Sequence, residues 1–192
     1  LSEEDINEEA IINSEYLYLE GYLVTSKKAF TAAIKSVEIA KENNIKVALS
    51  LSDPNIVSVF KDQFLEILKR KCDLIFCNVL EASAFANKKN LKKSVEIMRN
   101  FSLEGLITMG AEGCMAWDQV ESLKLSTSKV NALDTNGAGD MFAGAVLNSL
   151  CEGKTLIESA KFGCFAASEK VKSFGPRVDN NKYRKIKKEF FS

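Results

Sequence analysis

The sequence contains no histidine among its 192 residues. Imidazole can therefore act neither as a general base nor as a metal ligand, which excludes histidine-based catalysis and histidine metal sites. Basic and acidic residues balance, with 26 lysines and arginines against 26 aspartates and glutamates. The resulting formal net charge of +0 gives no electrostatic reason to expect nucleic acid or an anionic membrane as a partner.

Disulfide frameworks, zinc knuckles and membrane spans also lack support. The five cysteines are odd in number, include no C-x-x-C pair and lie mostly in apolar runs, so we expect a reducing, cytoplasmic setting. No apolar run approaches membrane-spanning length. The acidic start, Leu1-Ser2-Glu3-Glu4-Asp5, has no methionine and is not a secretory signal; we expect the sequence to begin within a longer protein.

Apolar periodicity alternates between strand-like and helix-like segments through the first half of the chain. Short runs predict strands, whereas apolar residues at a 3.6-residue spacing predict helices between them. The strands are expected at Tyr16–Leu19, Ile45–Leu51, Asp73–Cys77 and Leu106–Met109, and the helices at Ser26–Asn43, from Asp53-Pro54 through Leu68, at Leu80–Ala86 and at Leu91–Arg99. This order predicts an α/β fold with a mainly parallel sheet, in which ligands bind beyond the strand C-termini.

The second half changes pattern. A hairpin is expected from Gly113–Trp117 and Val120–Ser126, followed by a helix to Glu152, a long helix over Thr155–Ser173 and a basic, amphipathic tail over Asn180–Phe191. No repeat, linker or low-complexity segment interrupts the chain, so we predict one α/β domain over residues 1–192.

The stretch from Asp134 to Asp140 reads Asp-Thr-Asn-Gly-Ala-Gly-Asp and runs directly into apolar residues at helical spacing. Its glycines therefore lie at a helix N-terminus, where unpaired N–H groups and the positive end of the dipole suit an anion. Asp140 falls in the first helical turn beside that place. From spacing alone it is either a dipole partner or a base next to a phosphate, which is what phosphoryl transfer to a hydroxyl requires.

This stretch, with Met-Phe-Ala-Gly after it, resembles the signature of the ribokinase-like (PfkB-type) carbohydrate kinases, which include adenosine kinases. The resemblance implies a three-layer α/β/α fold with a mainly parallel central sheet. It implies that Asp140 is the catalytic base and that amides of Gly137, Ala138 and Gly139 form an anion hole. ATP and Mg²⁺ would be the cofactors.

Asn136 in the same loop makes the loop most similar to the adenosine-kinase-like branch of that family. We count Asn136 among the nucleotide-binding residues. The segments Leu49–Pro54 and Phe174–Arg177 point the same way.

Asn78 and Glu81 stand one helical turn apart after the third predicted strand. They form either a helix cap with its capping-box acid or an oxygen pair that holds a hydrated Mg²⁺. The Asn-x-x-Glu pattern is similar to the family motif with the second role. We therefore assign both residues to Mg²⁺, and Asn78 also to the nucleotide.

Residues 108–113 follow the fourth predicted strand and resemble the family's Thr-x-Gly-x-x-Gly turn, which lies against the ATP phosphates. Thr108, Gly110 and Gly113 are therefore expected to bind the nucleotide. Cys164 falls where relatives often carry Asn or His beside the adenine, although a small core residue is an equally good reading. Thiols are the poorer hydrogen-bond partners.

Asp134 is either an acid that stabilises the loop or part of a monovalent-cation site. The resemblance implies that K⁺ is held behind the anion hole by this acid and by carbonyls of about Lys170 to Gly175. The same resemblance covers only the C-terminal part of the family, so the N-terminal strands, the β-lid and the substrate loop are expected to be missing. The sheet would then have an unpaired edge, which makes a homodimer possible.

The predicted function is ATP-dependent phosphorylation of a hydroxyl on a small-molecule sugar or nucleoside. An alternative is a non-catalytic nucleotide-binding module that lacks an acceptor site. A dinucleotide-dependent oxidoreductase is disfavoured, because no G-x-G-x-x-G follows an early strand.

Overall fold

The computed structural model describes residues 1–192. Its packing forms two compact units, the first comprising Leu1–Ile107 with Trp117–Ser122 and the second Thr108–Ala116 with Leu123–Ser192. The single domain over residues 1–192 stays a prediction. None of the helices combines the length and the apolar character that crossing a membrane would require.

Four strands build the first unit: β1 (Tyr16–Glu20), β2 (Lys46–Ser50), β3 (Cys72–Asn78) and β4 (Ser102–Thr108). β1 pairs in parallel with β2, and β2 with β3, in a register that aligns Leu19 with Leu49 and Leu49 with Ile75. All three side chains are buried, as expected for strands covered on both faces. Within the first unit the strand order of the sheet follows the chain from β1 to β4.

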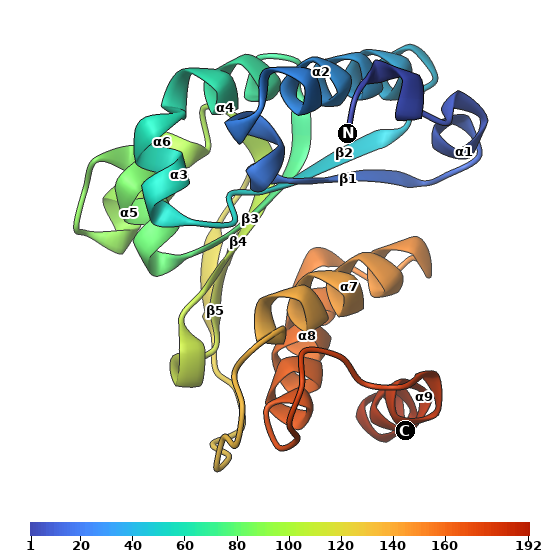
Figure 1. Cartoon of the computed structure of the whole chain (residues 1–192). Helices are drawn as coiled ribbons and strands as arrows, with labels where there is room; N and C mark the ends of the chain where they lie inside the picture. Colours follow the sequence, from blue (N-terminus) through green and yellow to red (C-terminus); the bar gives the residue numbers. More distant parts are fainter. The chain divides into compact units, whose positions relative to one another are not determined.

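The helices of the first unit are α1 (Glu8–Ile12), α2 (Lys27–Glu42), α3 (Pro54–Val59), α4 (Lys61–Leu68), α5 (Val79–Ala86) and α6 (Leu91–Met98), with 3₁₀ turns at Glu3–Asp5 and Gly21–Thr25. α2 shows why they form. Its buried residues, among them Ala29, Ala33, Val37 and Ala40, recur every three or four positions and make one apolar stripe. That stripe packs on β1 and β2 (Figure 1).

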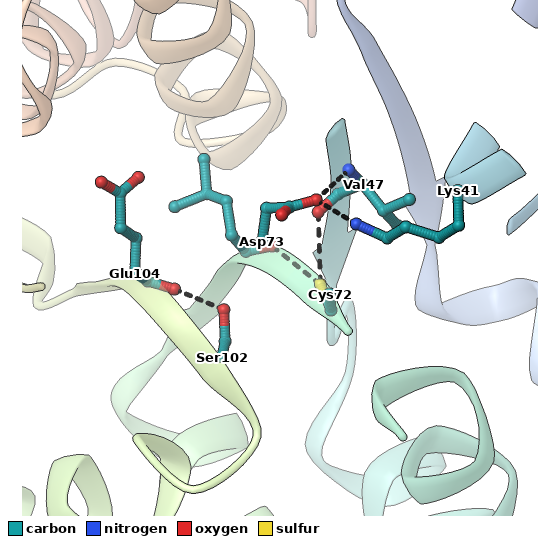
Figure 2. A network of polar contacts seen from close by, with 7 residues as sticks. Lys41, Val47, Cys72, Asp73, Ser102 and Glu104 are labelled. Atoms are coloured by element: carbon teal, nitrogen blue, oxygen red, sulfur yellow. Dashed lines mark hydrogen bonds and ion pairs between the residues drawn. The ribbon is translucent and has the colours of Figure 1, made fainter. Parts of the chain in front are cut away.

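A polar network fixes α2 to the strands (Figure 2). The Asp73 carboxylate accepts a hydrogen bond from the Val47 N–H (2.7 Å) and forms an ion pair with the Lys41 ammonium. Beside it the Cys72 thiol donates to the Val47 carbonyl (3.4 Å). Burial raises the pKa of this thiol to about 12, so Cys72 stays protonated and acts as a small core residue. This network lies at the N-terminal end of β3 and bears on stability.

The second unit contains a 3₁₀ turn (Gly110–Glu112), strands β5 (Cys114–Trp117) and β6 (Ser122–Leu125), and helices α7 (Ala138–Cys151), α8 (Leu156–Lys170) and α9 (Asn180–Phe191). α7 packs against α8, and α8 against α9 (Figure 1). Ala145, Phe162 and Ile186 form a buried cluster against which Tyr183 and Phe190 pack. The basic tail therefore docks through its apolar face, as its spacing predicts.

Two predicted boundaries need correction. The helix expected from Asp53-Pro54 through Leu68 is two helices, α3 and α4, which meet at Phe60. Phe60 leaves helical geometry there (φ −110°, ψ 30°), although the apolar period continues past it. β4 begins at Ser102 instead of Leu106. Its first residue, Ser102, is polar, Leu103 is exposed and Glu104 is half-buried, so no apolar run in the sequence marks this part of the strand.

Candidate functional site

The residues from Asp134 to Asp140 form a loop that ends in the first turn of α7. Gly137 is the N-cap and has a left-handed backbone (φ 74°). A Cβ added there would lie 2.1 Å from the Pro176 carbonyl oxygen, so only glycine fits this turn. The Gly137 carbonyl accepts the Met141 N–H (2.9 Å) and starts the helix.

The first turn of α7 carries the predicted catalytic groups. Gly139 and Asp140 are exposed, and the Asp140 carboxylate takes part in none of the salt bridges of the chain. First-turn N–H groups have no carbonyl four residues earlier within the helix, so this end can receive an anion. The Ala138 N–H, however, donates to the Thr135 carbonyl (3.1 Å), so one of the three amides predicted for the anion hole is used within the loop.

Asp134 ties this loop to the segment that follows α8. Its carboxylate accepts the N–H groups of Asn136 (2.9 Å) and Gly175 (2.8 Å). These two hydrogen bonds, and to a smaller degree the positive charge of Lys170, hold the pKa of Asp134 below its usual value. The main-chain N–H groups of Leu133 and Asp134 both donate to the Val171 carbonyl. Of the two roles left open by the sequence, the contacts fit the loop-stabilising one.

A cavity of about 300 Å³ lies within the second unit. Its volume is at the lower end of the range of small-molecule sites, roughly 300–1,000 Å³. Three segments that were singled out separately in the sequence line it: the turn after β4, the start of α7 and the middle of α8. The lining residues that the sequence analysis named are Thr108, Gly110, Gly113, Ala138, Gly139 and Cys164.

The turn after β4 owes its shape to close backbone contact. Gly113 has φ 94°, and a Cβ there would meet the Leu125 carbonyl oxygen at 2.0 Å. The Met109 N–H donates to the Gly113 carbonyl (2.8 Å), which closes the turn. Gly110, by contrast, has nothing within 4 Å of its Cβ position, so its backbone is open to a ligand.

The cavity wall also includes residues that the sequence did not reveal. Thr127, in the segment after β6, lines the cavity and donates through its hydroxyl to the Cys164 carbonyl (3.2 Å). Ser168, on α8, is a second hydroxyl in the wall. Thr127 lies in an irregular segment with no period, and Ser168 in a helix whose sequence does not mark the cavity side. Cys164 is buried and lines the cavity, so it is a small core residue in the cavity wall, and its contact with an adenine stays a prediction.

Asn78 and Glu81 belong to the first unit, at the junction of β3 and α5. They form a complete capping box, in which the Asn78 side chain accepts the Leu80 and Glu81 N–H groups, and the Glu81 carboxylate accepts the Asn78 N–H (2.9 Å). Glu81 is only 5% exposed. The cap predicted from the sequence is therefore present, and it does not by itself exclude a role with a metal.

Glu81 is electrostatically unusual. Burial raises its pKa, the Asn78 N–H lowers it, and the carboxylates of Asp53 and Glu20 raise it further. Glu20 ends β1 and Asp53 caps α3, so their charges act on Glu81 from the carboxyl ends of neighbouring strands, although no three acidic side chains of the chain lie close enough together to hold a metal ion. No base is among the groups that shift this pKa. Sequence reasoning missed Glu20 and Asp53, because only the parallel register brings these strand ends together.

Similar proteins are found both by sequence and by structure. Adenosine kinase of Saccharomyces cerevisiae is 30% identical over 185 residues, which are 88% of this chain and 53% of that protein. Ribokinase of Haemophilus influenzae is 30% identical over 146 residues, or 73% of this chain and 45% of that protein. The chain spans about half the length of the curated relatives that it matches.

Among solved structures, adenosine kinase from Sinorhizobium meliloti superposes with a TM-score of 0.93 at 27% identity, covering 98% of this chain and 58% of that one. A putative ribokinase II from E. coli shares the fold, with a TM-score of 0.86 at 16% identity over 98% of this chain and 64% of that one. These likenesses confirm the predicted three-layer, ribokinase-like α/β fold class. The family model described as "pfkB family carbohydrate kinase" matches residues 1–182, and the chain therefore belongs to the pfkB family of carbohydrate kinases.

Proposed function

We propose that this protein is a kinase that transfers the γ-phosphoryl group of ATP to a hydroxyl of a sugar or nucleoside. The observation that carries the proposal is the cavity, which joins the Thr108–Gly113 turn to the N-terminal turn of α7. The first turn of α7 offers backbone amides to a polyanion. Asp140, which follows Gly139 in that turn, carries an exposed carboxylate. The related adenosine kinases and ribokinase support the same class of reaction.

The nucleotide would lie in the cavity with its phosphates toward the α7 N-terminus. Small residues, Gly110, Ala138 and Gly139, leave the backbone open there, and the helix dipole favours negative charge. The Thr108 hydroxyl in the wall can bond to a phosphate or ribose oxygen, whereas the Thr127 hydroxyl, which donates to the Cys164 carbonyl, can accept from a ribose hydroxyl. Cys164 offers a thiol to the adenine. Because a thiol is a weak hydrogen-bond partner, the shape of the cavity would dominate recognition of the adenine at that point.

Asp140 would act as the general base. Its carboxylate accepts the proton of the acceptor hydroxyl while the hydroxyl oxygen attacks the γ-phosphorus, and ADP is the leaving group. Amides of the first turn of α7 stabilise the charge on the transferring group. Because phosphoryl transfer depends mainly on position and electrostatics, the fixed loop before the helix is as much a part of catalysis as the base.

Asn78 and Glu81 would hold Mg²⁺. The donors are the side-chain oxygen of Asn78 and the buried carboxylate of Glu81, and the charges of Asp53 and Glu20 also act on Glu81. This donor set fits a hydrated divalent cation, since Mg²⁺ prefers oxygen ligands and keeps several waters. When bound, the ion supplies charge neutralisation for the phosphates.

The test is Asp140→Asn in the full-length protein, measured as phosphoryl transfer to a panel of sugars and nucleosides together with calorimetry of ADP binding. We expect kcat to fall by about 10²–10⁴-fold, the usual contribution of a general base, with ADP affinity unchanged. Asp62→Asn is a matched control, because Asp62 is also an exposed acid in the first turn of a helix, α4. It removes a dipole partner without touching the site.

Two results would contradict the proposal. A kcat for Asp140→Asn within about tenfold of the unmodified protein would remove Asp140 as the base. ADP binding with no transfer to any acceptor would favour the alternative, a nucleotide-binding module. The homodimer stays a prediction, as does K⁺ as a cofactor.

A further inference from the structure

Lys170 is the one basic residue among the buried polar side chains of the chain, and its exposed fraction is 0%. It is the last residue of α8, and its ammonium donates a hydrogen bond to the Asp134 carbonyl (3.0 Å). A buried ammonium is unfavourable unless polar groups surround it. Two features compensate here: the hydrogen bond to Asp134 and the negative end of the α8 dipole, at which Lys170 stands.

The ammonium of Lys170 lies beside Asp134, where the family resemblance implies a K⁺ ion. That ion would take oxygens from Asp134 and from carbonyls of about Lys170 to Gly175. In the structure three of those groups already have donors. The Asp134 carboxylate accepts two N–H groups, the Val171 carbonyl accepts two more, and the Lys170 carbonyl accepts both the N–H and the hydroxyl of Ser173.

Charge also opposes a free cation at this place. The Lys170 ammonium lies on the Asp134 carbonyl, and the Lys182 ammonium donates to the Ser173 hydroxyl (2.9 Å) in the same segment. A K⁺ ion between them would meet two like charges. The residues present therefore do not fit K⁺.

We propose that Lys170 is a positioning residue whose ammonium is a built-in monovalent cation, which makes the loop before α7 independent of K⁺. The ammonium holds the Asp134 carbonyl, and Asp134 in turn fixes Asn136 and Gly175 through its carboxylate. Gly137, which follows Asn136 in the same loop, packs against the backbone of Pro176. The conformation of the loop, and with it the direction of the α7 amides, thus depends on a charge that the chain itself carries. This inference rests on the proposed function only where it concerns nucleotide.

The first measurement needs no variant and no nucleotide. Thermal unfolding of the protein is compared in KCl and in tetramethylammonium chloride at equal ionic strength. We expect the same Tm in both salts, because no K⁺ site is present. A Tm higher in KCl by more than about 2 °C would show that K⁺ binds the folded state, and would overturn the proposal whether or not the protein is a kinase.

The second measurement uses Lys170→Met, which keeps the length of the side chain and removes its charge. In tetramethylammonium chloride we expect ADP affinity to fall at least about fivefold, with recovery in KCl because the Asp134 carbonyl, which Lys170 no longer contacts, is then free to accept the ion. Lys172→Met is the control. Lys172 is exposed and pairs with Glu169, and its loss should change neither affinity nor salt dependence.

Recovery in KCl separates a bound charge from ordinary packing. A Lys170→Met variant with unchanged affinity, or one that is equally weak in both salts, would overturn the positioning role. If that variant does not fold, Lys170→Gln replaces it, and the salt comparison on the unmodified protein decides by itself. Absence of ADP binding to the unmodified protein in both salts would contradict the proposed function, while the Tm comparison would still decide on the built-in cation.

Discussion

Three glycines of one helix should respond to the same substitution in three different ways. Gly137, Gly139 and Gly144 lie at the N-cap, in the first turn and in the middle of α7. Alanine at Gly137 must adopt a left-handed backbone, which costs about 1–2 kcal/mol. Its Cβ would also lie 2.1 Å from the Pro176 carbonyl oxygen, a backbone atom, so the loop must move. Overpacking of this kind typically costs about 1–3 kcal/mol more.

Gly137→Ala should therefore lower the Tm by about 5 °C or more, given about 2–4 °C per kcal/mol for a chain of this size. Gly144 has nothing within 4 Å of its Cβ position, so Gly144→Ala should raise stability by about 0.5–1 kcal/mol through helix propensity alone. Gly139 is equally free of neighbours in the chain, but it lines the cavity. Gly139→Ala should keep stability and weaken ADP binding.

Thermal unfolding and ADP calorimetry on the three variants distinguish these outcomes. A Gly137→Ala protein as stable as the unmodified one would mean that the loop does not pack on Pro176. Unchanged ADP affinity in Gly139→Ala would mean that the phosphates bind elsewhere. Gly144→Ala is the internal control for both, since it changes the same helix without touching the loop or the cavity.

Other substitutions test single contacts. Glu81→Gln keeps the hydrogen bond from the Asn78 N–H but loses the one from the Asn78 side-chain amide, and it removes the charge, so the response of the Tm to MgCl₂ should shrink; an unaltered response would argue against a metal role. The lowered pKa of Asp134 contributes stability above its unfolded value near 3.8, which is lost as pH falls through the lower folded pKa. The unmodified protein should thus lose its advantage in the free energy of unfolding over Asp134→Asn below about pH 3.8. A difference between the two proteins that stays constant during acid unfolding would refute this assignment. Gly105→Ala would place a Cβ 2.0 Å from the Trp117 ring and should cost about 1–3 kcal/mol in denaturant unfolding with ADP affinity intact.

The sequence predicts most elements because their signals are local. An apolar stripe at helical spacing marks α2, and the Asp53-Pro54 pair marks the start of α3. The glycines at 137 and 139 mark the turn before α7 and its first residues. The Phe60 break escaped prediction because the apolar period continues through it, and a period reports a buried face without reporting whether the helix axis is continuous.

The parts of the site that the sequence could not reveal depend on tertiary placement. Lys170 lies in the run Glu169-Lys170-Val171-Lys172, which has the composition of a solvated helix end, and nothing local distinguishes the buried lysine from the exposed one. Glu20 and Asp53 are separated by 32 intervening residues in the chain, and only the parallel pairing of β1 with β2 gathers them near Glu81. Charged residues in such positions read as surface until the register is known.

The loop before α7 is held by two contacts of opposite polarity. The Asp134 carboxylate accepts the backbone N–H groups of Asn136 and Gly175, and the Lys170 ammonium donates to the Asp134 carbonyl. The chain's own groups thus satisfy both the carboxylate and the carbonyl of Asp134. Under the proposed function, a loop held in this way would lower the cost of binding the nucleotide and would direct the first-turn amides of α7 toward the charge that develops during transfer. Changes at Asp134 or Lys170 should therefore weaken nucleotide binding and transfer through the order of the loop, without the loss of a contact to the nucleotide.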